Sequence, residues 1–424
     1  MTRGAGEAGS PERLKRMKIA FVVEFFPNKD ELSGGVRVSV KRQAEALSSN
    51  HEVIVVACRT IFPGLSRYSA MAREQGARQR FRTSEGSLRI YRPACVHVPL
   101  VWKLTGPFQL MMWTIVVCAF MEKRISLIHA HRCFPAGLAA CFAAGVLRVP
   151  FVLTTYGSDV SQGLRRDVAG YWISSASRLA LSRADAVIAV SKALGDKITS
   201  FGVRPKKTRV VPSGVELLLS GATNREEARR RLGLPLDARI VLFAANLVPV
   251  KDPVTMVRAF LILREAMTNA LLVILGTGEL EEAVREEVRK ESASGFILLK
   301  GRRPRDEIPF WLAACDVVAL SSIDEGCPVI ALEGFVSGKP FVGTAVGGIP
   351  EIVPSEDFGL LSEAGNPSSL AGRLALALEK RWDKEVLVKH GRSFSWENQS
   401  SQISRVYDEV LEEKARHGAG SKIR

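Results

Sequence analysis

Short apolar runs alternate with longer mixed segments along most of the chain. In the first half the runs lie at residues 19–23, 51–57, 88–91, 127–130, 151–155 and 187–190. A second series lies at residues 240–244, 271–275, 296–299, 317–320, 341–343 and 359–361. Short apolar runs separated by helix-length segments are typical of buried parallel strands that are joined by helices. The pattern therefore predicts two successive α/β units, each with a parallel sheet.

A turn signal near the middle of the chain separates the two series. The segment 208–215 has the composition of a strand and ends in a Pro-Ser-Gly turn. A chain of 424 residues is long enough for two cores, since single cores stop growing at about 250–300 residues. We therefore expect a disordered tail over 1–16, one domain over 17–212 and a second over 213–393. Ligands of such sheets bind beyond the carboxyl ends of the strands, so we expect the site in the cleft between the domains.

The excess of positive charge lies entirely in the first half of the chain. Residues 1–210 contain 32 lysines and arginines against 14 aspartates and glutamates, a net charge of +18, while the rest of the chain carries a net −3. A solvated basic surface is one explanation, and attraction to anionic lipid head groups or to an anionic acceptor is the other. Nucleic acid is not an expected partner, because no nucleic-acid-binding motif accompanies the scattered basic residues. Part of the excess falls in 59–86, where weak periodicity predicts an insertion loop.

The apolar segments do not have the pattern of a membrane span. The longest uncharged span covers 104–121, but Gly106 and Pro107 predict that its helix begins only at Phe108. Fourteen residues at about 1.5 Å each give about 21 Å, short of the roughly 30 Å of hydrocarbon in a bilayer. We therefore expect a buried or interfacial helix. Residues 1–16 are polar and Gly-rich, without the apolar core of a signal peptide.

The cysteines indicate neither a disulfide framework nor a zinc site. There are seven, which is an odd number, no two of them form a C-x-x-C pair, and most lie among apolar residues. From this pattern we expect free thiols, a reducing compartment and no bound metal.

Two carboxylates flank the start of a predicted helix in the second unit. Glu325 follows the apolar run 317–320, and Gly326 ends that run. Pro328 suits the first position of a helix, whose free N–H groups attract phosphate and sugar oxygens. Glu333 lies further along this helix, where side chains lean back toward the N-terminus, so we expect it to reach the same cleft as Glu325. Carboxylates repel phosphate, and their predicted ligands are therefore hydroxyl groups.

A lysine lies at another predicted helix start in this unit. Lys251 directly precedes Asp252, which suits a helix cap, and Pro253, which suits the first helical position. The helix dipole disfavours a cation at this end, so we expect a bound diphosphate to supply the missing negative charge. A solvated surface lysine is the alternative. Gly276 and Gly278 also lie between a strand and a helix, where their backbone could approach phosphates.

Two Gly-containing segments follow the carboxylates: 338–340 (Gly-Lys-Pro) and 346–353 (Val-Gly-Gly-Ile-Pro-Glu-Ile-Val). Together with the spacing of Glu325 and Glu333, they resemble the C-terminal signature of retaining glycosyltransferase family 4. The resemblance covers roughly residues 17–410. It implies the α/β fold called GT-B, in which two Rossmann-like domains face each other across a cleft. It also implies that the final segment, 394–415, forms a helix that crosses back to the first domain.

The activity implied by the resemblance is that of a hexosyltransferase. Such an enzyme moves a sugar from a nucleotide diphosphate sugar, bound by the second domain, to a glycan or lipid-linked acceptor, bound mainly by the first. Retention of the anomeric configuration is implied, and neither a metal nor another cofactor is expected. The implied setting is cytoplasmic synthesis of cell-surface polysaccharide or glycolipid, with the enzyme either free or peripheral on the anionic cytoplasmic membrane face.

The resemblance also implies roles for individual residues. Glu325 lies beside the donor sugar, Glu333 binds the ribose hydroxyls and Lys251 contacts the diphosphate. Residues expected around the phosphates, the sugar and the base are Gly276, Gly278, Arg302, Gly326, Cys327, Pro328 and Val329. In the first domain, Gly34 and Gly35 belong to a Gly-rich loop near the donor phosphates and the acceptor.

The sequence departs from the family pattern at two of its site positions. Asn246 stands where the family usually has an arginine, so one of two cationic phosphate contacts is expected to be absent. Tyr156 stands where the family has a histidine beside the reacting sugar. Either the Tyr156 hydroxyl replaces the hydrogen bond of that histidine, or His131, which ends the preceding strand, approaches instead. We therefore count Tyr156 and His131 with Glu325 and Lys251 as candidate catalytic residues.

Other functions fit the same architecture, because a fold does not fix its chemistry. A sugar-nucleotide epimerase or a phosphorylase is the alternative enzyme. An inactive donor-binding partner is the alternative outside enzymes, and Asn246 and Tyr156 favour it. A dinucleotide oxidoreductase is not expected, because no G-x-G-x-x-G sequence follows the first strand.

Overall fold

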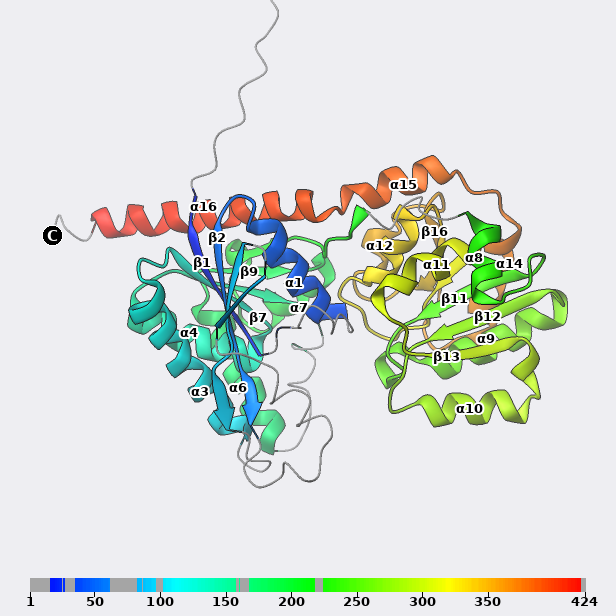
Figure 1. The fold of residues 1–424 in the computed structure, drawn as a ribbon, viewed down its shortest axis with the longest axis horizontal. Coiled ribbons are helices and arrows are strands. Elements are labelled where there is room, and N and C mark those ends of the chain that lie inside the picture. Colours follow the sequence, from blue (N-terminus) through cyan, green and yellow to red (C-terminus); the bar gives the residue numbers. More distant parts are fainter. Residues whose placement is uncertain are drawn as a thin grey trace, which may run out of the picture.

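Two parallel sheets, each covered by helices, form two α/β domains in the computed structural model of the chain (Figure 1). The structure describes residues 16–24, 26, 35–61, 82–85, 87–96, 102–157, 160, 168–217 and 224–420. Residues 1–15 of the predicted tail over 1–16, and most of the predicted insertion over 59–86, lie outside these residues. The predicted domain boundaries stay predictions, although the two sheets fall on either side of the expected boundary.

The first sheet has eight strands in the order β10-β9-β8-β7-β1-β2-β5-β4. They are β1 (Lys18–Val23), β2 (Glu52–Ala57), β4 (Arg82–Glu85), β5 (Leu88–Tyr91), β7 (Leu127–His131), β8 (Phe151–Thr155), β9 (Ala186–Ala189) and β10 (Thr208–Val210). All neighbouring strands are parallel except β4, which runs antiparallel to β5. The carboxyl ends of β1, β7, β8 and β9 therefore meet at one edge.

Helices cover both faces of this sheet. The helices α1 (Gly35–Leu47) and α16 (Trp396–Gly420) share one core with alternate residues of β1. The other residues of β1 face a second core. That core contains residues of α3 (Trp102–Val116), η1 (Val117–Glu122), η2 (Cys133–Gly137), α4 (Leu138–Leu147), α6 (Val168–Arg183) and α7 (Lys192–Ser200). The split follows from the alternation of side chains across a strand.

The second sheet has six parallel strands in the order β13-β12-β11-β14-β15-β16. They are β11 (Arg239–Ala244), β12 (Ala270–Leu275), β13 (Ile297–Gly301), β14 (Val317–Ala319), β15 (Phe341–Thr344) and β16 (Gly359–Ser362). Around them lie α8 (Arg225–Leu232), α9 (Pro253–Ala266), α10 (Glu281–Lys290), α11 (Ile308–Ala314), α12 (Val329–Val336), α13 (Ile349–Ile352), α14 (Pro367–Glu379) and α15 (Lys384–Ser393). The strand order reverses between β11 and β14, and ligands bind at such switch points.

The last helix returns the chain to the first domain. The backbone N–H of Trp396 donates to the carbonyl of Val215 at 3.3 Å, where the chain passes between the domains. From there α16 runs along the first domain (Figure 1). Its Ile403, Val406 and Tyr407 are buried in the same core as β1.

The predicted strands correspond to observed ones, and the differences have local causes. The strand expected over 208–215 ends at Val210. The helix expected from Phe108 begins at Trp102, so that Pro107 lies inside it. Proline lacks the N–H that would donate to the carbonyl one turn earlier. That carbonyl, of Lys103, accepts a hydrogen bond from the indole N–H of Trp172 at 3.0 Å instead, which lets the helix continue through the proline.

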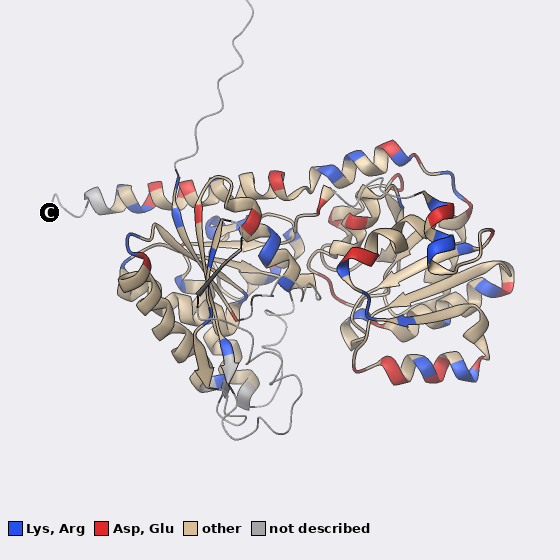
Figure 2. Ribbon diagram, in the orientation of Figure 1, with Lys and Arg blue, Asp and Glu red and all other residues tan. Residues whose placement is uncertain are grey.

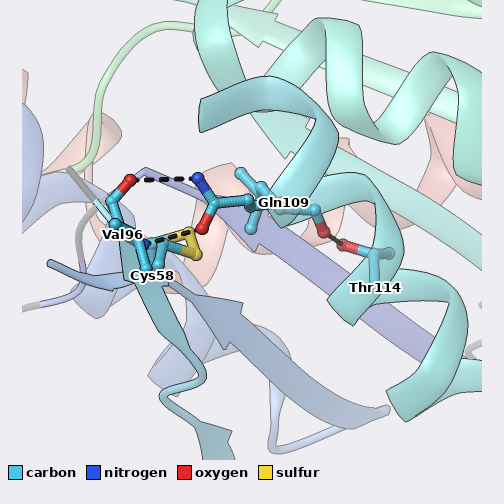
Figure 3. The surroundings of a disulfide bond; sticks show 6 residues. Cys58, Val96, Gln109 and Thr114 are labelled. Carbon is cyan, nitrogen blue, oxygen red and sulfur yellow. Dashed lines mark hydrogen bonds between the residues drawn. A yellow bond between two sulfur atoms is a disulfide. The ribbon is translucent and has the colours of Figure 1, made fainter. Parts of the chain in front are cut away.

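One disulfide contradicts the expectation of free thiols. Cys58 and Cys95 are bonded, with their Cα atoms 5.7 Å apart (Figure 3). Two short parallel strands, β3 (Arg59–Ile61) and β6 (Ala94–Val96), bring them together across 37 residues of sequence. The Gln109 side chain of α3 holds β6 by exchanging hydrogen bonds with the backbone of Val96. Cysteine spacing could not reveal this pair, because it depends on a long-range strand pairing.

Candidate active site

The predicted lysine and the first predicted carboxylate are in direct contact. Lys251 ends the short turn η6 (Pro249–Lys251) after β11, and Glu325 follows the neighbouring strand β14. The Lys251 ammonium forms an ion pair with the Glu325 carboxylate, and the Ser322 hydroxyl donates to the same carboxylate oxygen at 2.9 Å. The Glu325 side chain is 8% exposed and that of Lys251 is 23% exposed. Both charges therefore lie in one partly buried site at the switch point of the sheet.

The loop that carries Glu325 is held by close backbone contacts. Gly347 has φ of +52°, and a Cβ at this position would lie 2.0 Å from the carbonyl oxygen of Glu325. The N–H of Gly348 donates to that carbonyl at 2.9 Å. A Cβ on Gly326 would lie 2.4 Å from the carbonyl oxygen of Tyr156 in the first domain. Only glycines fit these three positions, so the backbone fixes where Glu325 stands.

The second predicted carboxylate is buried and paired with an arginine. Glu333 is 2% exposed and forms an ion pair with Arg305, which lies in the turn η8 (Arg305–Glu307) after β13. Arg305 also contacts Glu216 at 3.5 Å, and Glu216 contacts Arg42 of the first domain at 2.7 Å. Burial raises the pKa of Glu333, and the charge of Arg305 opposes that rise. Arg305 was not among the predicted site residues, although it is the third arginine after Gly301.

The other predicted residues of the second domain take different positions. Gly276 and Gly278 fit closely against a neighbouring loop. A Cβ on Gly276 would lie 1.9 Å from the carbonyl oxygen of Ala245, and a Cβ on Gly278 would lie 2.3 Å from the carbonyl oxygen of Leu247. Packing therefore explains these glycines, and their phosphate role stays a prediction. Asn246 and Arg302 are exposed.

The start of α12 lies one residue later than predicted, with Pro328 as the cap and Val329 as the first helical residue. Cys327, just before it, packs against the cores of both domains. Burial raises the pKa of its thiol to about 12, although a hydrogen bond with Ser213 opposes the rise. Cys327 is therefore a neutral packing residue between the domains at ordinary pH.

In the first domain the two candidate catalytic residues contact each other. Nδ1 of His131, at the end of β7, lies 2.9 Å from the hydroxyl of Tyr156, which follows β8. Behind them, His129 forms hydrogen bonds with the hydroxyls of Tyr407 at 2.6 Å and Thr154 at 2.7 Å. Burial lowers the pKa of His129 to about 3 and that of His131 well below its ordinary value. Both rings are therefore neutral, and the two alternatives for Tyr156 and His131 merge into one hydrogen-bonded pair.

Arg132 is a further cationic side chain at this edge that the sequence analysis missed. It follows His131 directly and has φ of +76°, which is uncommon for a residue other than glycine. Its guanidinium lies 3.7 Å from the carboxylate of Glu24, which follows β1. Burial raises the pKa of Glu24, and Arg132 opposes that rise. Backbone strain of this kind concentrates at functional sites.

Polar contacts join the two domains beside the site. The Glu351 carboxylate accepts the backbone N–H groups of Lys192 at 2.7 Å and of Ala193 at 2.8 Å, which are the first two residues of α7. Lys197 of the same helix contacts Asp324, next to Glu325, at 3.2 Å. The strand ends that carry Tyr156 and Glu325 are thus held against each other.

Two remaining predictions concern the Gly-rich loop and metal. Gly34 lies outside the described residues, and Gly35 is the exposed first residue of α1. Within the described ranges, histidine, cysteine and carboxylate side chains form no group of three that could hold a metal ion. The absence of a cofactor stays a prediction.

Most of the chain matches models of known protein families. Residues 33–217 match the family model "Glycosyltransferase Family 4", and residues 224–394 match "Glycosyl transferases group 1". The chain belongs to glycosyltransferase family 4. As predicted, this family 4 protein is an enzyme, a glycosyltransferase.

Individual relatives cover most of this family 4 enzyme. The D-inositol 3-phosphate glycosyltransferase of Corynebacterium glutamicum (strain R) is 28% identical over 330 residues, which are 72% of this chain and 78% of that protein. TuaC of Bacillus subtilis (strain 168), which is named as a glycosyltransferase of teichuronic acid biosynthesis, is 26% identical over 381 residues. That match covers 87% of this chain and 92% of TuaC.

A solved structure agrees with the fold of this family 4 enzyme. The crystal structure of Anabaena Alr3699/HepE in complex with UDP superimposes with a TM-score of 0.69. The match has 17% sequence identity and covers 93% of this chain and 100% of that one. The predicted GT-B architecture of two Rossmann-like domains is confirmed.

Proposed function

We propose that the enzyme transfers a hexose, with retention of configuration, from a nucleotide diphosphate sugar bound at the ends of β11, β13 and β14. The observation that carries the proposal is the contact of Lys251 with Glu325 at the switch point of the second sheet. A cation beside a carboxylate suits a ligand that has both phosphates and hydroxyls. In the complex, Lys251 contacts the diphosphate instead of Glu325, and Glu325 accepts hydrogen bonds from sugar hydroxyls.

The chemistry of such a transfer fits the remaining side chains. Glycosyl transfer passes through an oxocarbenium-like transition state, while negative charge develops on the departing diphosphate. Lys251 and the start of α9 stabilise that charge, because preorganised cations and N–H groups act strongly in a partly buried site. Tyr156, held by His131, offers a neutral hydroxyl to the sugar from the first domain. No side chain of the chain is required as a nucleophile.

The buried pair of Arg305 and Glu333 is proposed to bind the ribose. A carboxylate with raised pKa binds hydroxyls well only while it is ionised, and the charge of Arg305 favours that state. Arg305 is therefore a positioning residue that acts through Glu333.

For donor and acceptor, the relatives suggest where to start. HepE has been crystallised with UDP-glucose, which makes UDP-hexoses the first donors to test. The inositol phosphate and teichuronic acid in the relatives' names favour a glycan or lipid-linked acceptor with anionic groups, which the net +18 of residues 1–210 would attract. We place the enzyme in the cytoplasm, where it is either free or bound to the membrane face. The five cysteines that form no disulfide support this location, and the one disulfide counts against it.

A thermal-shift screen of UDP-, GDP- and ADP-sugars tests the proposal, because a ligand that binds only the folded state raises its stability. We expect one nucleotide class to raise the melting temperature, and the matching sugar nucleotide to be transferred or slowly hydrolysed. Failure of every nucleotide to bind would contradict the donor site. Binding without turnover would favour an inactive donor-binding partner, and phosphate-dependent turnover would indicate a phosphorylase.

A further inference from the structure

One surface of the first domain is apolar although it faces water. Phe120 is 73% exposed, Tyr171 is 66% exposed and Val146 is 64% exposed. The other large apolar side chains exposed on the same helices are Phe108, Met112, Met121 and Phe142. Exposed apolar side chains gathered on helices that pack side by side mark an interaction site more often than scattered ones do.

These side chains belong to one continuous helical layer. The inner sides of α3, η1, α4 and α6 share a single core, so their outer sides form one surface. Phe108 and Met112 are four residues apart in α3, and Phe142 and Val146 are four apart in α4, which keeps each pair on one side of its helix. Phe120 lies in η1, which continues α3. Between α4 and α6 the surface is hollowed by a groove of about 310 Å³, lined by Cys141, Phe142, Gly145, Val146, Leu179 and Arg183. We call this surface the α3–α6 face.

The charged residues in the helices of the α3–α6 face and just after them are almost all basic. Across residues 102–148 and 168–183 the sequence contains one acidic residue, Glu122. The Glu122 side chain is 3% exposed and paired with Lys18, so it does not reach the surface. The exposed cations are Lys123, Arg124, Arg148, Arg178 and Arg183. Of these, Lys123, Arg124, Arg148 and Arg183 form no ion pair with any acid in the described part of the chain.

Apolar side chains beside unpaired cations match the interface of an anionic bilayer. Apolar residues of such surfaces enter the boundary between head groups and acyl chains, while lysines and arginines contact lipid phosphates. A second copy of the chain would bring identical cations face to face in a two-fold interface, which disfavours that occupant. Bulk binding of polyanions would not require Phe120 or Met112 to be exposed. Among the described residues, no helix is long and apolar enough to cross a bilayer.

We propose that the α3–α6 face docks on an anionic lipid bilayer, with Met112, Phe120 and Val146 inserted among the lipids. Lys123, Arg124, Arg148 and Arg183 then contact the lipid phosphates. In Figure 1 the helices α3 and α4 lie on the side of the first domain away from the second, and in Figure 2 they are mostly tan. Docking there leaves the second domain free to bind its donor. This proposal assigns a specific surface to the peripheral membrane location that we proposed in the preceding section. It does not depend on the donor assignment.

Sedimentation of the full chain with vesicles tests this surface. We expect binding to phosphatidylglycerol vesicles at low salt, little binding to phosphatidylcholine vesicles, and release at about 1 M salt, where the Debye length is about 3 Å. The charge variant replaces Lys123, Arg124, Arg148 and Arg183 with Gln. Its matched control replaces four exposed cations of the second domain with Gln: Arg230, Arg285, Arg289 and Lys290. Both variants lose four positive charges. A difference in vesicle binding between them would therefore come from the α3–α6 face and not from the net charge of the chain.

The apolar variant replaces Met112, Phe120 and Val146 with Ser. Its matched control carries Leu236→Ser, Ile262→Ser and Leu376→Ser, which alter exposed apolar residues of the second domain. We expect each α3–α6 variant to lose at least tenfold in vesicle affinity and each control to stay within about threefold of the parent chain, since one lysine or arginine near an anionic bilayer contributes about 1 kcal/mol. The melting temperature and its shift by UDP show separately that each variant is folded and that its donor site is intact.

Three results would overturn the proposal. The first is failure of the parent chain to bind phosphatidylglycerol vesicles at low salt. The control variants could lose as much affinity as the α3–α6 variants, which would indicate general attraction. Equilibrium sedimentation without lipid could reveal a dimer that the apolar variant dissociates, which would assign the face to a second copy of the chain.

Discussion

The candidate site takes two charged pairs from the second domain. From the first domain it takes a neutral hydrogen-bonded pair, which lies beside the ion pair of Arg132 with Glu24. In the second domain, Lys251 pairs with Glu325, and Arg305 pairs with Glu333. At the facing strand ends of the first domain, His131 and Tyr156 form a hydrogen bond between groups that carry no charge at neutral pH. This is notable because the first domain carries the whole excess of positive charge.

The difference follows from what each half is proposed to hold. A diphosphate and a ribose need a cation and a carboxylate. In the structure each of these charges is paired with an opposite charge of the chain, as buried charges require. A sugar ring that gains positive character needs acceptors nearby and no cation. Burial keeps His131 neutral and so meets that need. Lys123, Arg124, Arg148 and Arg183 of the first domain are instead exposed on the α3–α6 face.

We expect the largest effect to be a loss of stability of the first domain at acidic pH. Three buried histidines of the first domain, His51, His129 and His131, have pKa values that burial lowers from 6.5, and the second domain has one, His390. Below pH 6.5 these groups gain protons more readily in the unfolded chain than in the folded one, so stability falls as pH falls. Each histidine lowers the free energy of unfolding by up to about 1.4 kcal/mol per pH unit. The three histidines of the first domain together lower it by up to about 4 kcal/mol per pH unit. Hydrogen exchange at pH 7 and about 5.5 should therefore find first-domain peptides opening first, whereas earlier opening of second-domain peptides would contradict the contrast.

Removal of the lysine should have the largest effect on catalysis. We expect Lys251→Gln to weaken binding of the nucleotide diphosphate about tenfold and to slow transfer by tenfold to about a hundredfold, since one electrostatic contact to a developing charge is worth roughly 2–4 kcal/mol. Steady-state kinetics and UDP titration measure both effects. Lys290→Gln, on the exposed surface of α10, is the matched control and should change neither. Unchanged donor affinity and rate in Lys251→Gln would falsify the phosphate role.

The second charged pair should show its role through pH. Loss of Arg305 leaves the Glu333 carboxyl buried without its cation, so its pKa should rise further and donor binding should weaken by about 1.5–3 kcal/mol at neutral pH. Because the ionised form returns as pH rises, Arg305→Gln should recover donor affinity in base. Adding Glu333→Gln should remove that pH dependence, and UDP titrations from about pH 6 to 9 measure it. A pH profile equal to that of the parent enzyme would leave Arg305 without a role at Glu333.

The sequence predicted the features that local chemistry controls. Continuous apolar runs are enough to predict strands that are buried on both faces, such as β11 and β12. Cap chemistry is similarly local: Asp252 accepts from the N–H of Thr255, and Pro253 is the first residue of α9, as expected. These two regularities predicted that Lys251 and Glu325 each follow a strand of the second sheet. That the two strands, β11 and β14, are neighbours comes from the structure.

The features that the sequence did not predict depend on distant segments. Arg305 reaches Glu333 only because the chain turns sharply after β13, and the disulfide of Cys58 and Cys95 depends on the pairing of β3 with β6. Pro107 misled the helix prediction because Trp172, far along the chain, satisfies the carbonyl that the proline leaves open. Such contacts are not encoded in the local pattern of polar and apolar residues.

The neutral pair of His131 and Tyr156 should contribute less to catalysis than the charged pairs of the second domain. Tyr156→Phe removes one neutral hydrogen-bonding group, worth about 1 kcal/mol, so we expect turnover to fall roughly fivefold while UDP affinity stays unchanged. Tyr156→His restores the residue usual in the family and should recover at least part of the rate. Transfer assays with UDP titration separate the two quantities. A loss of UDP affinity in Tyr156→Phe would move Tyr156 into the donor site and break the division of roles.

The smallest effect is expected where the two halves meet. Glu351 brings a charge of the second domain to the start of α7, where the helix dipole and two N–H groups favour a carboxylate by about 0.3–1 kcal/mol. Glu351→Ala removes that contact without touching Lys251, Glu325 or Tyr156, so the closed arrangement should be less populated and kcat/KM should fall about two- to fivefold. Small-angle scattering should find a larger mean radius of gyration, which addition of UDP reduces. Glu356→Ala, at an exposed acid of the same domain, is the control. If Glu351→Ala and Glu356→Ala give the same radius and the same kcat/KM, the contact does not hold the charged and the neutral halves together.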